Sequence, residues 1–461
     1  MNFKHSFTYY VIVLHLLLIP LVPLKVYLGP LPLSAEVVLI PLLVLAFLWD
    51  YKNKQITINK EAPIKMFAIL FGLYFLVQII SLTQAEALTP AAMEMARYLS
   101  YAFLFLIVLA VSFTKREYVT FAITFFIAMT IMTTYGVLQF AFDWNLNKAG
   151  LYALIDAHGR VQSFTNNPNY WAGLINFVLP IVLLLSVVWA KDKRLQLGLF
   201  ALFSLLVVNQ IFTYTRSAWV IMVLAILMAF LFLPRKFFKK AIKVHILIPI
   251  ILLTVVVYNL PDVEERTRSS VFVIQSFIPD SVTQGALGGG VADPEEEEKT
   301  EEDRFTEGMG TAAVASRTTL WKTGLTMYQE NPVLGVGVGN YSTNYKDIVT
   351  RYPNLYVGHD TYSVHNSFIK VMAETGTIGI IAFLAIYIYY YLYIGELYLR
   401  NRQDLTSQVL LIGLFIGSGT FMGQNLANNL VFIPQINVIF WLVSALLLSY
   451  IINRNNQKTA N

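Results

Sequence analysis

The chain has 461 residues, of which 56% are hydrophobic and only 13% are charged, and its mean hydropathy is +0.59. This composition excludes a set of soluble domains and indicates an integral membrane protein, so the formal net charge of +5 does not point to a nucleic-acid partner. The chain contains no cysteine, which excludes a disulfide framework, a thiol nucleophile and a thiolate metal site.

Long apolar runs recur along the whole chain, and each is long enough to cross a hydrocarbon core of roughly 30 Å. We predict an all-α polytopic membrane protein in which residues 1–461 form a single membrane domain. About twelve transmembrane helices are expected, over residues 8–28, 33–50, 63–82, 97–113, 118–139, 168–189, 195–212, 216–233, 242–259, 365–396, 407–424 and 434–452.

The short connections between these runs alternate in charge. Every second one is basic, as in DYKNKQITINKEAPIK, TKRE, PRKFFKKAIK and YLRNRQD. Because lysine and arginine stay on the cytoplasmic side, both termini are predicted to be cytoplasmic. Residues 260–363, between the ninth and tenth spans, then form a large extracytoplasmic loop.

An acidic run within this loop, GGGVADPEEEEKTEEDRFTEGMG, has almost nothing to bury. We expect residues 285–310 to be disordered. A calcium-binding or partner-binding acidic patch is the less favoured alternative.

The stretch from Ser316 to Gly379 holds most of the residues that could carry out chemistry. Its first half predicts an amphipathic helix that begins at Ser316 as N-cap and ends before Pro332, because proline disfavours helix at the preceding residue. The glycines of GVGVG, residues 335–339, predict a tight loop. A nucleotide-binding loop is disfavoured, because no βαβ pattern surrounds them.

Three residues from separate segments fall at the same predicted membrane face: Arg216, Arg317 and His365. Guanidinium groups bind phosphate oxygens through forked donors, and an imidazole can accept a proton from a hydroxyl near neutral pH. Each residue also has a structural interpretation, as an interfacial anchor, a solvent-facing helix residue and a helix-start residue respectively. The convergence of the three favours a catalytic role.

Glu374 is an ionisable group inside the tenth span. Nine residues of helix turn it away from His365, so a proton relay between them is not expected. Lys370, four residues earlier, offers a structural partner.

Polar and aromatic residues near the same face are candidates for contacts with sugar hydroxyls and sugar rings. In NNPNYW, an ordinary helix cap with an interfacial aromatic belt is the equally weighted alternative. The predicted substrate-binding residues are Asn166, Asn169, Trp321, His359 and Asn366. No metal-ligand motif occurs in the outer segments, so no metal and no cofactor are expected.

Three motifs, TRSAW, SRTTLWKTGLTMYQENPVLGVGVGNY and HNSFIKVMAETGTIG, resemble those of the bacterial O-antigen ligase and polymerase superfamily of membrane glycosyltransferases. The resemblance implies metal-independent transfer of glycan from undecaprenyl diphosphate to a sugar hydroxyl, at the outer face of the cytoplasmic membrane. It implies that Arg216 and Arg317 bind the diphosphate and that His365 activates the acceptor.

We therefore predict a surface-polysaccharide polymerase, whose partners are an undecaprenyl-diphosphate-linked oligosaccharide and a glycan acceptor. An O-antigen-type ligase, which attaches the finished glycan to a lipid or protein acceptor, is the alternative, because the motifs do not encode the acceptor. A glycan flippase or transporter is disfavoured, because the candidate charges gather at one face rather than near the midplane of several spans.

Overall fold

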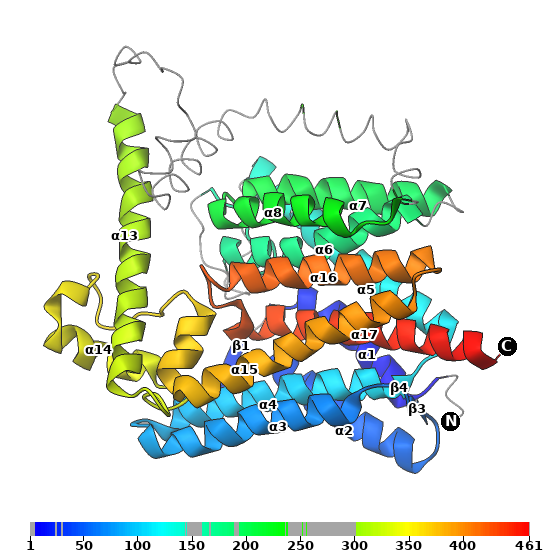
Figure 1. Cartoon of the computed structure of the whole chain (residues 1–461). Coiled ribbons are helices and arrows are strands. Elements are labelled where there is room, and N and C mark those ends of the chain that lie inside the picture. Colours follow the sequence, from blue (N-terminus) through cyan, green and yellow to red (C-terminus); the bar gives the residue numbers. More distant parts are fainter. Residues whose placement is uncertain are drawn as a thin grey trace.

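The computed structural model describes residues 5–23, 25–28, 31–142, 144, 159–165, 167–188, 193–235, 237, 251, 255 and 301–460. Nearly all of this part of the chain is helical (Figure 1). The first half contains α1 (Phe7–Leu21), α2 (Ala35–Lys52), α3 (Ile64–Ser81), η1 (Leu82–Gln84), α4 (Leu88–Ala110), α5 (Lys115–Phe142), α6 (Pro168–Val188), α7 (Lys193–Phe212) and α8 (Arg216–Phe232). The second half contains α13 (Glu301–Glu330), α14 (Tyr341–Arg351), η3 (Pro353–Leu355), α15 (Ser367–Arg400), α16 (Leu405–Gln424), η4 (Leu430–Phe432) and α17 (Pro434–Ala460).

One antiparallel hairpin and one pair of short antiparallel strands that are distant in sequence depart from the predicted all-α fold. Strand β1 (Lys25–Leu28) pairs with β2 (Leu31–Ser34), and β3 (Thr57–Ile58) pairs with β4 (Val111–Ser112). The first hairpin follows α1, which ends at Leu21, so the helix is shorter than the predicted span 8–28. Backbone groups beyond that point pair within the hairpin instead.

Eight of the described helices are long and apolar enough to cross a membrane: α3 with η1, α4, α5, α6, α7, α15, α16 and α17. This result indicates a polytopic membrane protein. The predicted spans 8–28 and 216–233 correspond to shorter apolar helices, and the predicted span 33–50 overlaps α2, which runs from Ala35 to Lys52. Most of the predicted span 242–259 lies outside the described residues, so the number twelve stays a prediction.

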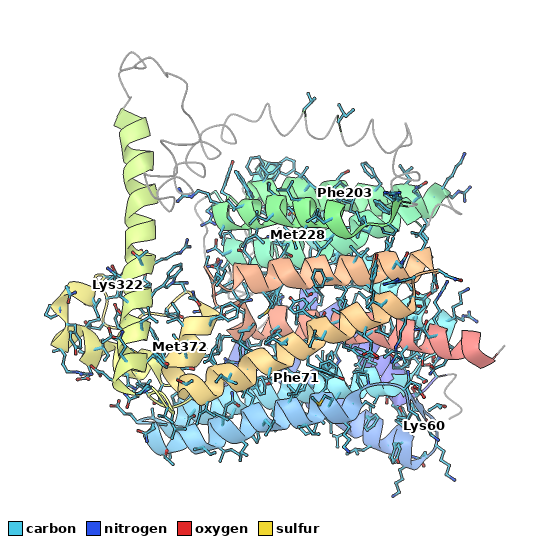
Figure 2. All side chains as sticks on the ribbon, in the orientation of Figure 1. Lys60, Phe71, Phe203, Met228, Lys322 and Met372 are labelled. Atoms are coloured by element: carbon cyan, nitrogen blue, oxygen red, sulfur yellow. The ribbon has the colours of Figure 1, made fainter. Side chains whose placement is uncertain are left out.

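The membrane helices pack side by side in one bundle (Figure 1). Helix α16 packs against α6 and α8, α6 against α7, α17 against α4, and α1 against α2 and α5. One large apolar core runs through these helices. Helix α13 stands across one end of the bundle, with α14 beside it. Figure 2 shows Lys322 on α13 at that end and Lys60 near the other.

We call these the site end, where α13 and α14 lie, and the basal end, where α1 begins and α17 ends. Two of the connections predicted to be cytoplasmic, those that hold Asn59 and Asp404, contact the end of α17 at the basal end. There the Asn59 Nδ2 donates to Asn453 Oδ1 at 2.9 Å, and Arg454 bonds the Asp404 carboxylate. These contacts put the two connections at one end of the bundle, and the side of the membrane on which this end lies stays a prediction.

Two predicted helix starts are wrong. Helix α13 begins at Glu301, so Ser316 lies inside it and is not its N-cap. Helix α15 begins at Ser367 with Asn366 as N-cap, so His365 precedes the helix. The predicted stop before Pro332 is confirmed, because α13 ends at Glu330. Of the predicted disordered segment 285–310, residues 285–300 lie outside the described residues and residues 301–310 belong to α13.

Candidate functional site

The three predicted catalytic residues come together at the site end. Burial lowers the pKa of Arg317, and the like charge of Arg216 lowers it further. Burial also lowers the pKa of His365, and the nearby Arg317 adds to this effect. Two guanidinium groups and one imidazole therefore share a partly buried region. Among the described residues, Arg317 and His365 form no ion pair with a carboxylate.

Arg317 lies on α13, and a row of buried residues that begins one turn after it holds the helix against its neighbours. Leu320, Met327 and the intervening Gly324 face α14 and the start of α15. A Cβ added at Gly324 would lie 2.6 Å from the Ile369 side chain, so the glycine permits a close approach. The spacing of these residues is that of one helical face, so this face of α13 packs against α14 and α15 next to Arg317.

His365 occupies a backbone conformation that side-chain-bearing residues rarely adopt, with φ at +51°. This left-handed conformation costs about 1–2 kcal/mol in a residue other than glycine, so the surroundings must impose it. Val364 before it is fully buried. The ring of His365 meets that of Tyr362 edge to face, with centroids 6.0 Å apart.

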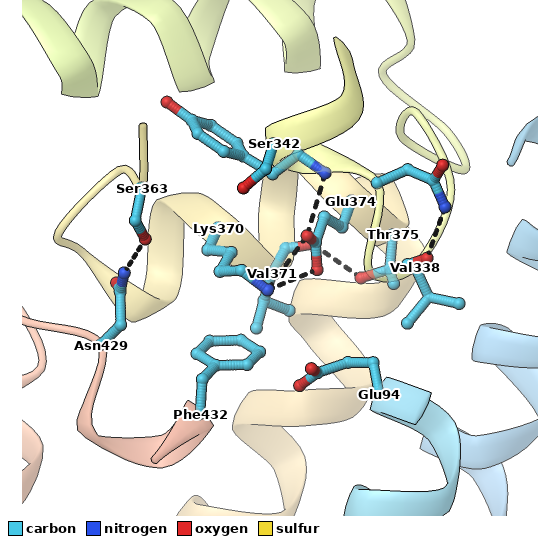
Figure 3. Close-up of polar contacts among 12 residues, drawn as sticks. Glu94, Val338, Ser342, Ser363, Lys370, Val371, Glu374, Thr375, Asn429 and Phe432 are labelled. Carbon is cyan, nitrogen blue, oxygen red and sulfur yellow. Dashed lines mark hydrogen bonds and ion pairs between the residues drawn. The ribbon is translucent and has the colours of Figure 1, made fainter. Parts of the chain in front are cut away.

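Glu374 has the structural role predicted for it (Figure 3). The Lys370 ammonium lies 3.0 Å from the Glu374 carboxylate, which also accepts the backbone N–H of Tyr341 at 3.1 Å. The same ammonium lies 3.8 Å from the centre of the Phe432 ring. Glu374 thus ties the beginning of α14 to α15, and Lys370 connects this pair to η4.

The predicted tight glycine loop is also structural. Gly335, Gly337 and Gly339 all have positive φ, and a Cβ added at Gly335 would lie 2.4 Å from the carbonyl oxygen of Ala373. Val336 N–H donates to that same oxygen at 2.9 Å. The loop therefore packs backbone against backbone on α15, which only glycine allows at such contacts.

Asn169, a predicted substrate-binding residue, has its side-chain oxygen occupied by protein donors. It accepts from Arg160 Nη2 at 3.0 Å and from Thr215 Oγ1 at 3.2 Å. The Arg160 Nε donates to the Thr213 carbonyl at 2.9 Å. Arg160 therefore lies beside the residue that precedes Arg216. The sequence analysis missed it, although a basic residue close to NNPN in an outer segment was an available signal.

The other predicted binding residues have different surroundings. The Trp321 indole N–H is buried and has no hydrogen-bond partner in the described part of the chain. His359 is exposed, and its ring lies 5.7 Å from that of Tyr362. The Asn366 side chain caps α15 by accepting two backbone N–H groups at 3.0 and 3.1 Å. Asn166 lies outside the described residues.

Within the ranges that the structure describes, no group of three or more histidine, cysteine, aspartate or glutamate side chains is placed to hold a metal ion. The metal-free site stays a prediction.

Comparison with known proteins adds one finding. The family model described as O-antigen ligase matches residues 199–384. The matched segment begins in α7 and ends in α15, and it includes Arg216, Arg317 and His365. No curated protein sequence matches the chain.

Proposed function

We propose that this chain, which belongs to the O-antigen ligase/polymerase superfamily by its match over residues 199–384, polymerises a surface polysaccharide. The donor is a glycan linked to undecaprenyl diphosphate, and the acceptor is a hydroxyl of a second glycan. Ligation of a finished glycan to a lipid or protein acceptor is the same chemistry with a different acceptor.

One observation carries the proposal: Arg317 interacts electrostatically with both Arg216 and His365. In the reaction, the acceptor oxygen attacks the anomeric carbon while its proton passes to His365. The bond between that carbon and the lipid diphosphate breaks, and the diphosphate leaves with the bonding electrons. Arg216 and Arg317 stabilise the negative charge that grows on it.

Burial supports this division of roles. Because the pKa of His365 is lowered from its usual value near 6.5, the imidazole is neutral at physiological pH and can accept a proton. Arginine keeps its charge even where burial lowers its pKa, since its usual value is far above neutral. The imidazole can therefore stay neutral as a base while the two nearby arginines stay positively charged.

Substrate recognition is assigned to the residues around this centre. We propose that the indole N–H of Trp321, which has no partner among the described residues, donates to a sugar hydroxyl and that the exposed His359 contacts the acceptor. Asn169 and Asn366 act through protein contacts, because the first orients Arg160 and the second caps α15.

The test uses purified protein and a lipid-linked repeat unit, with and without a chelator, and separates the products on a gel. A polymerase gives a ladder of repeats and a ligase gives one product with an added lipid or protein acceptor. Loss of product in the His365→Ala variant is expected. Vesicles that move the lipid-linked glycan across the membrane without forming a glycosidic bond would support a transporter instead.

We further propose that the site end is extracytoplasmic, at the outer face of the bacterial cytoplasmic membrane, with both termini inside. The alternation of basic connections supports this orientation. The chain has no native cysteine, so single cysteines at the exposed Asn354 and Lys60 provide the test. A membrane-impermeant maleimide should label the first in intact cells and not the second, and the reverse pattern would overturn the orientation.

A further inference from the structure

The backbone around His365 is held on both sides by one segment from elsewhere in the chain. Two residues before His365, the Ser363 hydroxyl accepts a hydrogen bond from the Asn429 side-chain amide (Figure 3). Two residues after it, Ser367 donates its backbone N–H to the Asn425 carbonyl at 2.9 Å. The segment 425–429, between α16 and η4, therefore contacts both flanks of His365.

Asn425 is the most fully bonded member of this segment. Its side-chain oxygen accepts from the Ser367 hydroxyl at 2.6 Å and from the Val431 N–H at 3.0 Å, and its Nδ2 donates to the Phe421 carbonyl at 2.8 Å. The side chain is fully buried. Hydrogen bonds are directional, and these three join Asn425 to residues of α15, α16 and η4. Asn425 therefore fixes the three elements relative to one another.

The backbone conformation of His365 is unfavourable by itself. Its φ of +51° is unfavourable for a histidine. The neighbouring Asn366 side chain bonds only the N–H groups of Phe368 and Ile369, so it does not hold the backbone of His365. Asn425 lies beyond the matched segment 199–384, so the constraint is supplied by a part of the chain that the family model does not cover.

We propose that Asn425 is a positioning residue that holds His365 in this conformation through Ser367. This proposal rests on the proposed function, since it assumes that the imidazole is the general base. Asn425 does not touch the substrate. It keeps the imidazole partly buried, facing Arg317 of α13 and the Tyr362 ring.

The test compares Asn425→Ala with Asn401→Ala. Asn401 is a matched control, because it is buried, follows the last residue of α15 and donates Nδ2 to the carbonyl four residues earlier at 2.8 Å. It lies at the far end of α15 from His365. Both variants are purified, and the turnover of each is measured per folded molecule over a range of pH.

For Asn425→Ala we expect kcat to fall roughly 10- to 10²-fold, as for a small misplacement of a reacting group. KM for the lipid-linked donor should stay within about twofold, because the two arginines are untouched. A loosened imidazole also becomes better hydrated and moves away from Arg317. The acidic limb of the kcat profile should therefore move to higher pH, whereas Asn401→Ala should keep the wild-type kcat and profile.

Ser367→Ala gives a second variant if Asn425→Ala does not fold, because it removes only the hydroxyl donor and fills no new space. It should move the acidic limb in the same direction. A wild-type kcat and pH profile in Asn425→Ala, or in Ser367→Ala where the first fails to fold, would overturn the positioning role. The His365→Ala variant separates the two claims: if it is fully active, the general-base assignment has failed, and if it is inactive while the Asn425 and Ser367 variants are normal, only the positioning claim has failed.

Discussion

The two ends of the bundle bury polar groups in opposite ways. At the basal end the Asp50 carboxylate is fully buried, and it accepts the Thr8 N–H at 2.6 Å, the Thr8 hydroxyl at 2.7 Å and the Phe7 N–H at 3.2 Å. Asn453 accepts from Asn59 at 2.9 Å and donates to the Tyr118 hydroxyl at 2.6 Å.

The site end leaves strong donors without such partners. Arg317 has no carboxylate partner among the described residues; the like charge of Arg216 lowers its pKa, and Arg317 in turn lowers the pKa of His365. The Trp321 indole N–H is buried and unpaired in the same part of the structure. A buried polar group without a partner destabilises the folded state. Retaining several of them at one end is typical of a site that a charged, hydroxyl-rich ligand completes.

The comparison predicts that polar substitutions at the site end reduce turnover and that those at the basal end reduce stability. The largest effect should come from His365→Ala, which removes the proposed base and should lower turnover roughly 10²–10⁴-fold. The amount of folded protein should not change. His5→Ala is the control at the basal end, where His5 bonds Glu117 at 2.9 Å, and it should retain its turnover per folded molecule.

Arg317→Lys should come next, with a loss of roughly 10²-fold in kcat/KM. Lysine keeps the charge but lacks the forked donors that match a diphosphate. The control is Arg351→Lys on α14, where the exposed guanidinium bonds both oxygens of Glu330 at 2.7 and 2.9 Å. Equal activity of the two variants would mean that Arg317 is an ordinary helix residue and that the two ends do not differ as described.

The pH profile sharpens the same contrast. Burial and Arg317 both lower the pKa of His365 from its usual value near 6.5. The imidazole should therefore stay neutral at a pH at which an ordinary histidine is already protonated. Activity should fall only when the pH drops through this lowered value. In Arg317→Gln the like charge is removed and the pKa rises, so the acidic limb of the residual activity should move to higher pH. An unmoved limb would disconnect His365 from Arg317.

Glu374 lies at the site end but is paired with Lys370 at 3.0 Å. Glu374→Gln therefore tests whether a substitution at this end lowers turnover because of its location, or lowers stability because it breaks an ion pair. Removing one charge of a buried pair destabilises a protein by about 3–5 kcal/mol. We expect a lower unfolding temperature in detergent and normal turnover per folded molecule. Inactive but stable protein would place Glu374 in the chemistry.

The smallest effect is expected from Asn453→Ala at the basal end. It leaves the Asn59 amide and the Tyr118 hydroxyl short of a partner, which should lower the free energy of unfolding by about 1–3 kcal/mol. Turnover per folded molecule should match the wild type. A catalytic defect in this stable variant would show that the two ends are coupled.

The sequence by itself determined the features that depend on residues within a few turns of one another. Long apolar runs predicted membrane-crossing helices, of which eight are found in the described residues. Pro332 predicted the end of α13, and the spacing of Lys370 and Glu374 predicted their ion pair. Such signals can be seen in the sequence because helix stops and i,i+4 pairs are set by local backbone geometry.

Only the tertiary structure decided the boundaries and the partners that join distant segments. Ser316 resembles a helix cap, yet α13 continues through it to Glu301. The sequence predicted Arg216, Arg317 and His365 at one face, but the interactions of Arg317 with the other two required the first residue of α8 and the segment before α15 to lie near α13. The hydrogen bonds of Arg160 to Asn169 and of Ser367 to Asn425 follow from no local spacing in the sequence. A hydrogen bond between remote residues is fixed by packing in three dimensions, which no local pattern records.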